Sequence, residues 1–203
     1  MKFFKTPRFF KWIFPKRLWG FSMNENVVYL TFDDGPTEEL TTWILDLLKE
    51  KEVKATFFCV GANAKKFPAL MKRTINDGHA IGNHTMYHDK GTKISKKEYL
   101  ESVHEARKLI DSDLFRPPYG RLPMTHAKVI AKEFQIVMWS WLSYDYDITI
   151  PIERILEKSS LINKGDVLVL HDNKKTVNRT KELLPALIDS LKERGFTFST
   201  ISV

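Results

Sequence analysis

Two adjacent carboxylates, Asp33 and Asp34, end an apolar run in the stretch TFDDGP (31–36). Two carboxylates this close repel each other, which raises the pKa of one of them unless a cation or a strong hydrogen-bond donor lies beside the pair. The pair therefore predicts a neighbouring positive charge. The alternative is a solvated turn at the end of a strand, because Asp, Gly and Pro are common turn residues.

Histidines form a second group that could do chemistry. His84 and His88 are four residues apart in GNHTMYH (82–88). On one turn of a helix, side chains at this spacing point the same way and can share a metal ion. A chance pair remains an alternative, because the chain has six histidines. His171 ends the apolar run GDVLVLHD (165–172), where a histidine is a candidate general acid or base.

Other polar and aromatic residues also follow apolar runs. Arg116, in FRPPYG (115–120), is a good partner for a carboxylate, or else a surface side chain of a simple turn. The stretch VMWSWLSYDYD (137–147) passes from apolar to aromatic and acidic residues. Its aromatic side chains could form a wall for a sugar or an acyl group, or pack in the core.

Apolar runs that alternate with helical patterns must position these residues. Thr37 is the expected N-cap of the first helix, and SKKE (95–98) has the pattern of a capping box. Repeated strand–helix units predict an α/β fold with a parallel sheet, open or closed into a barrel, whose strands carry function at their carboxyl ends. The predicted strands are 27–32, 53–60, 79–82, 114–116, 135–141, 167–171 and 196–201. Further predicted helices cover 66–76, 124–133, 151–160 and 180–194.

Composition predicts an ordinary globular protein of 203 residues whose single cysteine excludes an intrachain disulfide. The net charge of +7 is local, because residues 1–22 hold six cations, eight aromatic residues and no acid. This basic aromatic arm could lie in a membrane interface or pack over the edge of the barrel or sheet. No apolar run in the arm reaches the length of a signal peptide or a membrane span. No nucleic-acid partner is expected, since only charge favours one.

Five stretches in this order, TFDDGP, HTMYH, RPPYG, WSWLSYD and LVLHD, resemble the signatures of the polysaccharide deacetylase family, the NodB-homology domain of carbohydrate esterase family 4. The resemblance spans residues 27 to about 198, so residues 23–203 are expected to form this domain after the arm of residues 1–22. It implies a distorted, incomplete (β/α) barrel, which agrees with about seven parallel strands. It also implies a metal-dependent hydrolase that releases acetate from the N-acetyl groups of an N-acetylglucosamine-type glycan, such as peptidoglycan or chitin.

The resemblance also assigns roles to single residues. Asp34, His84 and His88 would hold one divalent metal ion, with Zn²⁺ favoured and Co²⁺, Ni²⁺ or Fe²⁺ as alternatives. Asp33 would act as the general base and His171 as the general acid.

The remaining assignments are supporting ones. Arg116 would pair with Asp33, and Asp145 would orient His171 and favour its imidazolium form. The backbone N–H of Tyr119 would meet the oxyanion, and Tyr146 and Val169 would shape the pocket for the acetyl methyl group.

One position departs from the family pattern, because Leu142 stands where many relatives have Asp. Asp145 is preferred over Asp147 for the position beside His171 because of its spacing from Trp139. The alternative function is a carbohydrate-binding protein that keeps the fold without turnover. The chain is expected to act as a monomer, either cytoplasmic or membrane-associated, and the sequence does not choose the glycan.

Overall fold

The computed structural model describes residues 2–7, 9–22 and 25–202, so Met1, Arg8 and the first residues of the expected 23–203 domain lie outside the described residues. Its strands are β1 (Arg17–Leu18), β2 (Val27–Asp33), β3 (Ala55–Cys59), β4 (Ala80–Asn83), β5 (Leu114–Phe115), β6 (Gln135–Val137), β7 (Trp141–Leu142), β8 (Val167–His171) and β9 (Thr197–Phe198). The α-helices are α1 (Phe9–Ile13), α2 (Glu38–Glu50), α3 (Gly61–Lys66), α4 (Pro68–Asn76), α5 (Lys96–Arg107), α6 (Met124–Ile130), α7 (Ile152–Lys158) and α8 (Val177–Glu193). Short 3₁₀ helices cover Pro118–Gly120 and Ser159–Leu161.

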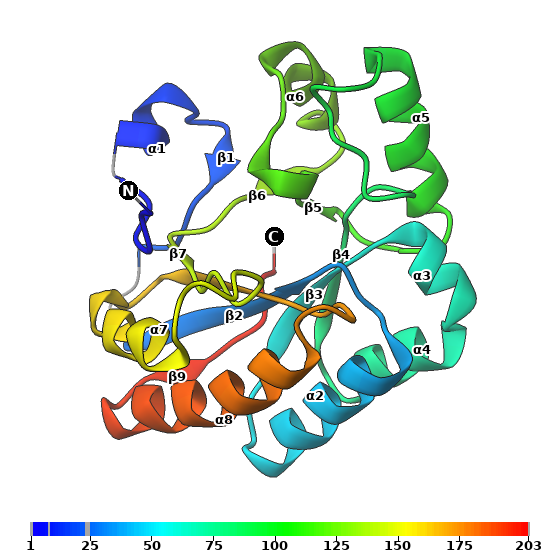
Figure 1. Ribbon diagram of the computed structural model, residues 1–203. Helices are drawn as coiled ribbons and strands as arrows, with labels where there is room; N and C mark the ends of the chain where they lie inside the picture. The colour runs from blue at the N-terminus through cyan, green and yellow to red at the C-terminus, as the bar shows by residue number, and fades with distance from the viewer. Residues whose placement is uncertain (1, 8, 23–24, 203) are drawn as a thin grey trace.

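The strands form one sheet in the order β1-β6-β5-β4-β3-β2-β8-β7, with β9 added beside β2, and its strand pairs are parallel. The helices lie around the outside of these strands (Figure 1). Every residue of β2 is buried, as expected for a parallel strand that is covered on both faces. The prediction of an α/β, incomplete barrel is confirmed.

Register brings the ends of the central strands to one edge. Asp33, the last residue of β2, lies opposite His171, the last residue of β8. Asn83 ends β4 and pairs with both Cys59 of β3 and Phe115 of β5. The loops that follow these strands therefore leave the same rim, which places the polar residues of several distant stretches next to one another.

The N-terminal arm is built into the sheet. Its strand β1 pairs with β6, and the side chains of Phe4 and Trp19 are buried. Single antiparallel bridges from Lys5 to Trp141 and from Gly20 to Asp166 connect the arm to the other end of the strand path. In the ring of helices, α1 lies between α6 and α7 (Figure 1). The structure therefore shows the packed form of the arm.

Several predicted elements differ in detail. The predicted strand 135–141 is two strands, β6 and β7, because the chain leaves the sheet between them, and β1 was not predicted at all. The predicted helix 66–76 corresponds to α4, which begins at Pro68, and the preceding α3 was not predicted. Thr37 does stand at the N-cap of α2, but its hydroxyl makes no cap hydrogen bond and donates instead to Asp172. The capping box of Ser95 and Glu98 is present at the start of α5.

Candidate active site

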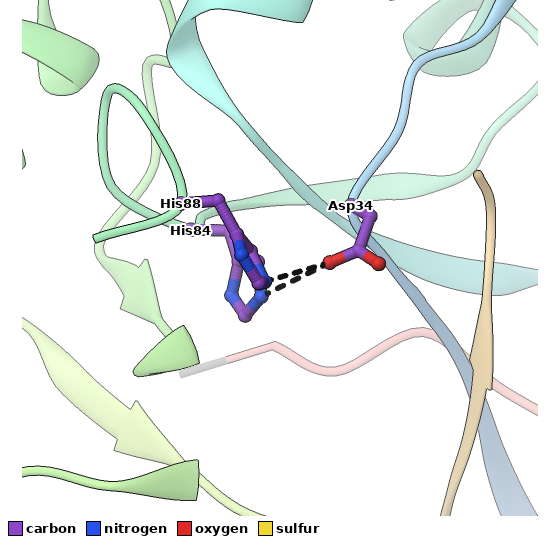
Figure 2. Close-up of side chains that lie close together, drawn as sticks. All are labelled: Asp34, His84 and His88. Atoms are coloured by element: carbon purple, nitrogen blue, oxygen red, sulfur yellow. Dashed lines mark ion pairs between the residues drawn. The ribbon is translucent and has the colours of Figure 1, made fainter. Parts of the chain in front are cut away.

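Three possible metal ligands converge at the rim of the barrel. Asp34 follows β2, whereas His84 and His88 belong to the loop after β4, and both imidazole rings point toward the Asp34 carboxylate (Figure 2). The Nε2 atoms of His84 and His88 lie 3.6 and 3.0 Å from Oδ1 of Asp34. One ligand atom from each of the three residues lies within 4.8 Å of the others, which is compact enough to surround one cation.

The two histidines are not on a helix, so the expectation of a shared helical turn was wrong. Residues 84–90 form a loop, and α5 begins only at Lys96. Left-handed backbone at Thr85 (φ 64°) and His88 (φ 59°) turns the chain so that the second ring returns beside the first. Such conformations are unfavourable for residues other than glycine, and a group of them in one place is typical of functional sites. Asp34 is also left-handed, with φ 83°.

The side-chain chemistry fits a cation. Oδ1 of Asp34 is buried without a hydrogen-bond partner among the described residues, although two imidazole nitrogens face it. Nδ1 of His84 lies 2.8 Å from the carbonyl oxygen of Arg116, so Nδ1 carries the proton of this hydrogen bond. In the neutral ring, Nε2 then carries a lone pair. An electron pair aimed at an unsatisfied carboxylate oxygen makes no good hydrogen bond, but it suits a metal between them.

Electrostatics favour an ionised Asp34. Burial by itself raises the pKa of this carboxyl, but the imidazole groups of His84 and His88 that face it, together with His171, outweigh burial and lower the pKa well below its ordinary value. Two amides hold the residue in place: Nδ2 of Asn173 donates to its Oδ2 over 2.7 Å, and Nδ2 of Asn63 donates to its backbone carbonyl over 2.8 Å.

The second carboxylate, Asp33, has a different partner. Nη1 of Arg116 lies 2.6 Å from Oδ1 of Asp33, and both side chains are buried. The guanidinium also donates to Thr31 Oγ1 and to the carbonyls of Val137 and Met138, so each of its three nitrogens donates a hydrogen bond. Burial lowers the pKa of Arg116, while the Asp33 charge raises it. The two neighbouring aspartates therefore avoid mutual repulsion by facing different partners.

His171 pairs with Asp145, which lies in the loop after β7. Nδ1 of His171 lies 2.7 Å from Oδ1 of Asp145, whose Oδ2 accepts the backbone N–H of His171 over 2.7 Å. Burial lowers the pKa of His171, but the buried Asp145 carboxylate outweighs burial and raises it to about 9. Asp147, by contrast, pairs with Lys2 at the surface. The structure thus brings Asp145, and not Asp147, to the histidine.

These groups surround an open cavity of about 750 Å³. Tyr119, Tyr146 and Val169 contribute to its wall, as do Asp33, Asp34, His84, His88 and His171. The Tyr146 ring stands edge-on to His171 with 5.0 Å between ring centroids, and the Tyr119 ring lies 4.6 Å from that of His88. Trp139 and Leu142 also line the cavity, whereas Trp141 is fully buried in the core. Arg116 and Asp145 lie behind the wall, each against a residue that lines it.

Comparison with known proteins agrees with this geometry. Residues 21–138 match the family model described as polysaccharide deacetylase. The chain belongs to the polysaccharide deacetylase family. A peptidoglycan-N-acetylglucosamine deacetylase of Bacillus cereus is 34% identical over 193 residues, which cover 91% of this chain and 90% of the relative.

Solved structures show the same likeness. The crystal structure of the peptidoglycan N-acetylglucosamine deacetylase Bc1960 with 4-naphthalen-1-yl-N-oxidanyl-benzamide has a TM-score of 0.88 and 33% identity, covering 97% of this chain and 95% of that chain. A family 4 carbohydrate esterase from Streptomyces lividans in complex with acetate has a TM-score of 0.80 and 28% identity, covering 89% and 95%. The predictions of the family and of a hydrolase that removes acetyl groups are confirmed. Metal dependence is general in this family, and the residues of this deacetylase domain fit a metal.

Sequence reasoning missed a buried carboxylate beside the site. Asp172 is fully buried and accepts hydrogen bonds from the hydroxyls of Thr37 and Thr41 in the chain that follows Asp34. A Cβ atom on Gly35 would lie 2.3 Å from its Oδ2, so only glycine leaves room for it. Burial raises the pKa of Asp172 to about 7. Its position directly after His171 was the only sequence signal, and nothing local indicates that it faces the loop of residues 34–37.

Proposed function

We propose that this deacetylase removes N-acetyl groups from peptidoglycan, with Asp34, His84 and His88 as metal ligands. The observation that carries the proposal is that these three residues converge on one open cavity with two separate ion pairs, Asp33–Arg116 and Asp145–His171. A carbohydrate-binding protein without turnover has no use for two charged pairs at the reacting centre.

The three ligands, two imidazoles and one carboxylate, best suit Zn²⁺ among the divalent metals, because Zn²⁺ prefers nitrogen and carboxylate ligands in a compact site. When bound, the cation supplies Lewis acidity that polarises a carbonyl and makes a water more acidic. Three protein ligands leave positions open for substrate and water.

The chain's own residues move the protons. Asp33 is held by Arg116 at one oxygen and accepts a proton from the attacking water. Nδ1 of His171 is engaged by Asp145, so its Nε2–H is the group that can protonate the amide nitrogen as the C–N bond breaks. One proton taken from water and one given to nitrogen balance the hydrolysis of an acetamide to acetate and an amine. The Tyr119 backbone N–H is proposed to stabilise the oxyanion, a role in which a single donor is typically worth about 3 to 4 kcal/mol.

The acetyl methyl group is proposed to lie against Val169 and Tyr146. Val169 is almost completely buried in β8 and still contributes to the cavity wall two residues before His171. The Tyr146 ring stands edge-on to the His171 ring. A small apolar pocket next to the acid favours an acetyl group over longer acyl groups, which would be excluded by volume.

The charge of the cavity rim supports an acidic glycan as the substrate. Four cationic residues line the cavity, namely Lys90, Arg121, Lys174 and Lys175. None of them forms an ion pair with a carboxylate of the described residues. The acidic residues in the lining are Asp33 and Asp34, which are engaged by Arg116 and by the two histidines. Peptidoglycan carries carboxylates on its peptides, and on the lactyl groups of muramic acids that bear no peptide, whereas chitin is neutral. The complementary rim therefore favours peptidoglycan.

Metal content and acetate release test the proposal together. Asp34→Ala, His84→Ala and His88→Ala should each lose bound zinc in elemental analysis and lose acetate release from peptidoglycan. The matched control is His104→Ala, because His104 is a half-exposed histidine that pairs with Glu133 away from the cavity. It should keep both properties. Full metal content in all three ligand variants would contradict the assignment.

Asp33→Asn separates catalysis from binding. This variant should keep its zinc and lose acetate release, because Asn cannot take the proton from water. Binding of peptidoglycan by the parent protein without any acetate release would favour the carbohydrate-binding alternative. Lys174→Gln and Lys175→Gln should raise KM on peptidoglycan and leave it unchanged on neutral chitin oligomers.

A further inference from the structure

Large apolar side chains protrude from the N-terminal arm and from the start of α6. On α1, Trp12 is 87% exposed, and Phe9 and Ile13 are each more than half exposed. Met124, the first residue of α6, is also more than half exposed. Large exposed apolar residues gathered in one region of a protein mark an interaction surface, whereas single ones need no explanation. We call this region the α1 patch; it comprises these four side chains, the exposed Lys11 and Lys16, and the groove between the arm and α6.

A groove lies between the arm and α6. Its cavity of about 400 Å³ is lined mainly by apolar residues of the two segments 14–17 and 124–128, together with Ile136 of β6. Phe14 continues directly from α1, so the groove begins where the protruding side chains of α1 end. Two exposed lysines, Lys16 and Lys128, stand on its lining, and no acidic residue does.

The cations of the arm that the structure describes divide into two sets. Lys2 and Lys5 are paired with Asp147 and Asp166, and the guanidinium of Arg17 donates to the carbonyl of Leu122 and lies 4.2 Å from the ring of Phe14. These cations hold the arm to the body of the protein. Lys11 and Lys16 are exposed, and neither has an ion pair among the described residues. Among the described cations of the arm, those left for an outside partner are therefore the two beside Trp12 and the groove.

We propose that the α1 patch docks on the anionic surface of a lipid bilayer. Protruding aromatic and aliphatic side chains can enter the headgroup region, where tryptophan is favoured, while flanking lysines contact negative headgroups. The absence of acid among residues 1–22 and in the groove lining removes repulsion from that surface. No helix among residues 2–7, 9–22 and 25–202 is long and apolar enough to cross a membrane.

Docking would also keep the catalytic cavity close to the lipid. Arg121 lines that cavity and Met124 lines the groove, and three residues of chain span at most about 10 Å. The proposal itself does not depend on deacetylation, because it rests only on the surface of the arm and α6.

Point substitutions in the full chain test the patch, because Phe4, Arg17 and Trp19 of the arm are buried and deletion of the arm would disturb the sheet. The parent protein should co-sediment with phosphatidylcholine vesicles that contain phosphatidylglycerol, and less with phosphatidylcholine alone. Trp12→Ala should weaken this partitioning by about tenfold or more, since it removes the largest exposed apolar surface. Lys11→Gln and Lys16→Gln should each weaken it by about fivefold, and added salt should do the same.

Matched controls lie elsewhere on the surface. Ile148 is 82% exposed and precedes α7, so Ile148→Ala removes a similar apolar group outside the patch. Lys97, with its side chain 86% exposed on α5, provides the charge control Lys97→Gln. Both controls should bind vesicles like the parent. The proposal is overturned if the parent does not bind anionic vesicles, or if Trp12→Ala binds as well as Ile148→Ala. A dimer in sedimentation velocity that Trp12→Ala dissolves, without vesicle binding, would instead assign the patch to a second copy of the chain.

Discussion

Replacing Asp145 by Asn tests how the candidate acid is held. In the parent, both carboxylate oxygens of Asp145 accept hydrogen bonds: Oδ1 from Nδ1 of His171 and from Oγ of Ser143, and Oδ2 from the backbone N–H of His171. An amide offers only one acceptor oxygen. Its NH₂ group would either oppose the backbone N–H or donate to Nδ1 of a neutral imidazole. Both arrangements disfavour the protonated ring.

The size of the effect follows from the pKa. Asp145 raises the pKa of His171 to about 9, against the lowering effect of burial. Without the charge, the pKa should fall to the ordinary value of about 6.5 or below. At pH 8 the protonated fraction would drop from about nine-tenths to about 3%, which is a loss of about 30-fold in the active form. One mismatched buried donor should also cost about 1 to 3 kcal/mol of stability.

The pair is linked to stability with a definite sign. Because the pKa of His171 is raised in the folded state, the pair stabilises the parent fully below pH 6.5, and this contribution is lost as the pH rises through about 9. The variant should lack that loss, so the difference in unfolding free energy between parent and variant should shrink at high pH.

The assay is kcat against pH for the zinc-loaded parent and Asp145→Asn on one acetylated oligomer, with release of the free amine as the signal. The alkaline limb of the profile should move to lower pH in the variant while its zinc content stays unchanged. His171→Ala, measured beside it, should lose most of kcat and keep its zinc. An alkaline limb that does not move in Asp145→Asn would refute the pairing as the source of the acid, and near-normal kcat in His171→Ala would refute the acid itself.

Two further predictions concern the groups behind the cavity. Arg116→Met should lower the unfolding free energy, measured in urea, by about 3 to 5 kcal/mol, because it leaves the Asp33 charge buried and unpaired. The control Arg107→Met, at a partly exposed ion pair, should lower it by less than about 1 kcal/mol, and equal effects would contradict the stabilising role of the buried pair. Gly35→Ala should lower the unfolding free energy by about 1 to 3 kcal/mol, because the new Cβ would lie 2.3 Å from Oδ2 of Asp172. In a double-mutant cycle the added Asp172→Ala should recover part of that loss, and strictly additive effects would show that the contact is unimportant.

The sequence was sufficient for the fold class, because hydrophobic periodicity and turn residues are local signals. The capping box at Ser95 and the apolar run that became the fully buried β2 are examples. The sequence also indicated a candidate acid or base where a histidine ends an apolar run, as His171 does at the end of β8. The ordered stretches that resemble the deacetylase signatures supplied the roles, and local periodicity alone would have left each of those residues with a structural alternative.

Only the tertiary structure decided which of these residues meet and how. The four-residue spacing of His84 and His88 indicated a helix, but left-handed backbone in a loop brings their rings together, since contacts across the sheet outweigh local preference. Thr37 is a good N-cap by residue type, yet its hydroxyl donates to Asp172, which directly follows β8 and lies 135 residues away in the sequence. Likewise the arm reads as a separate basic segment, and its place in the sheet depends on β6, far along the chain. Such pairings are set by long-range packing, which has no local sequence signal.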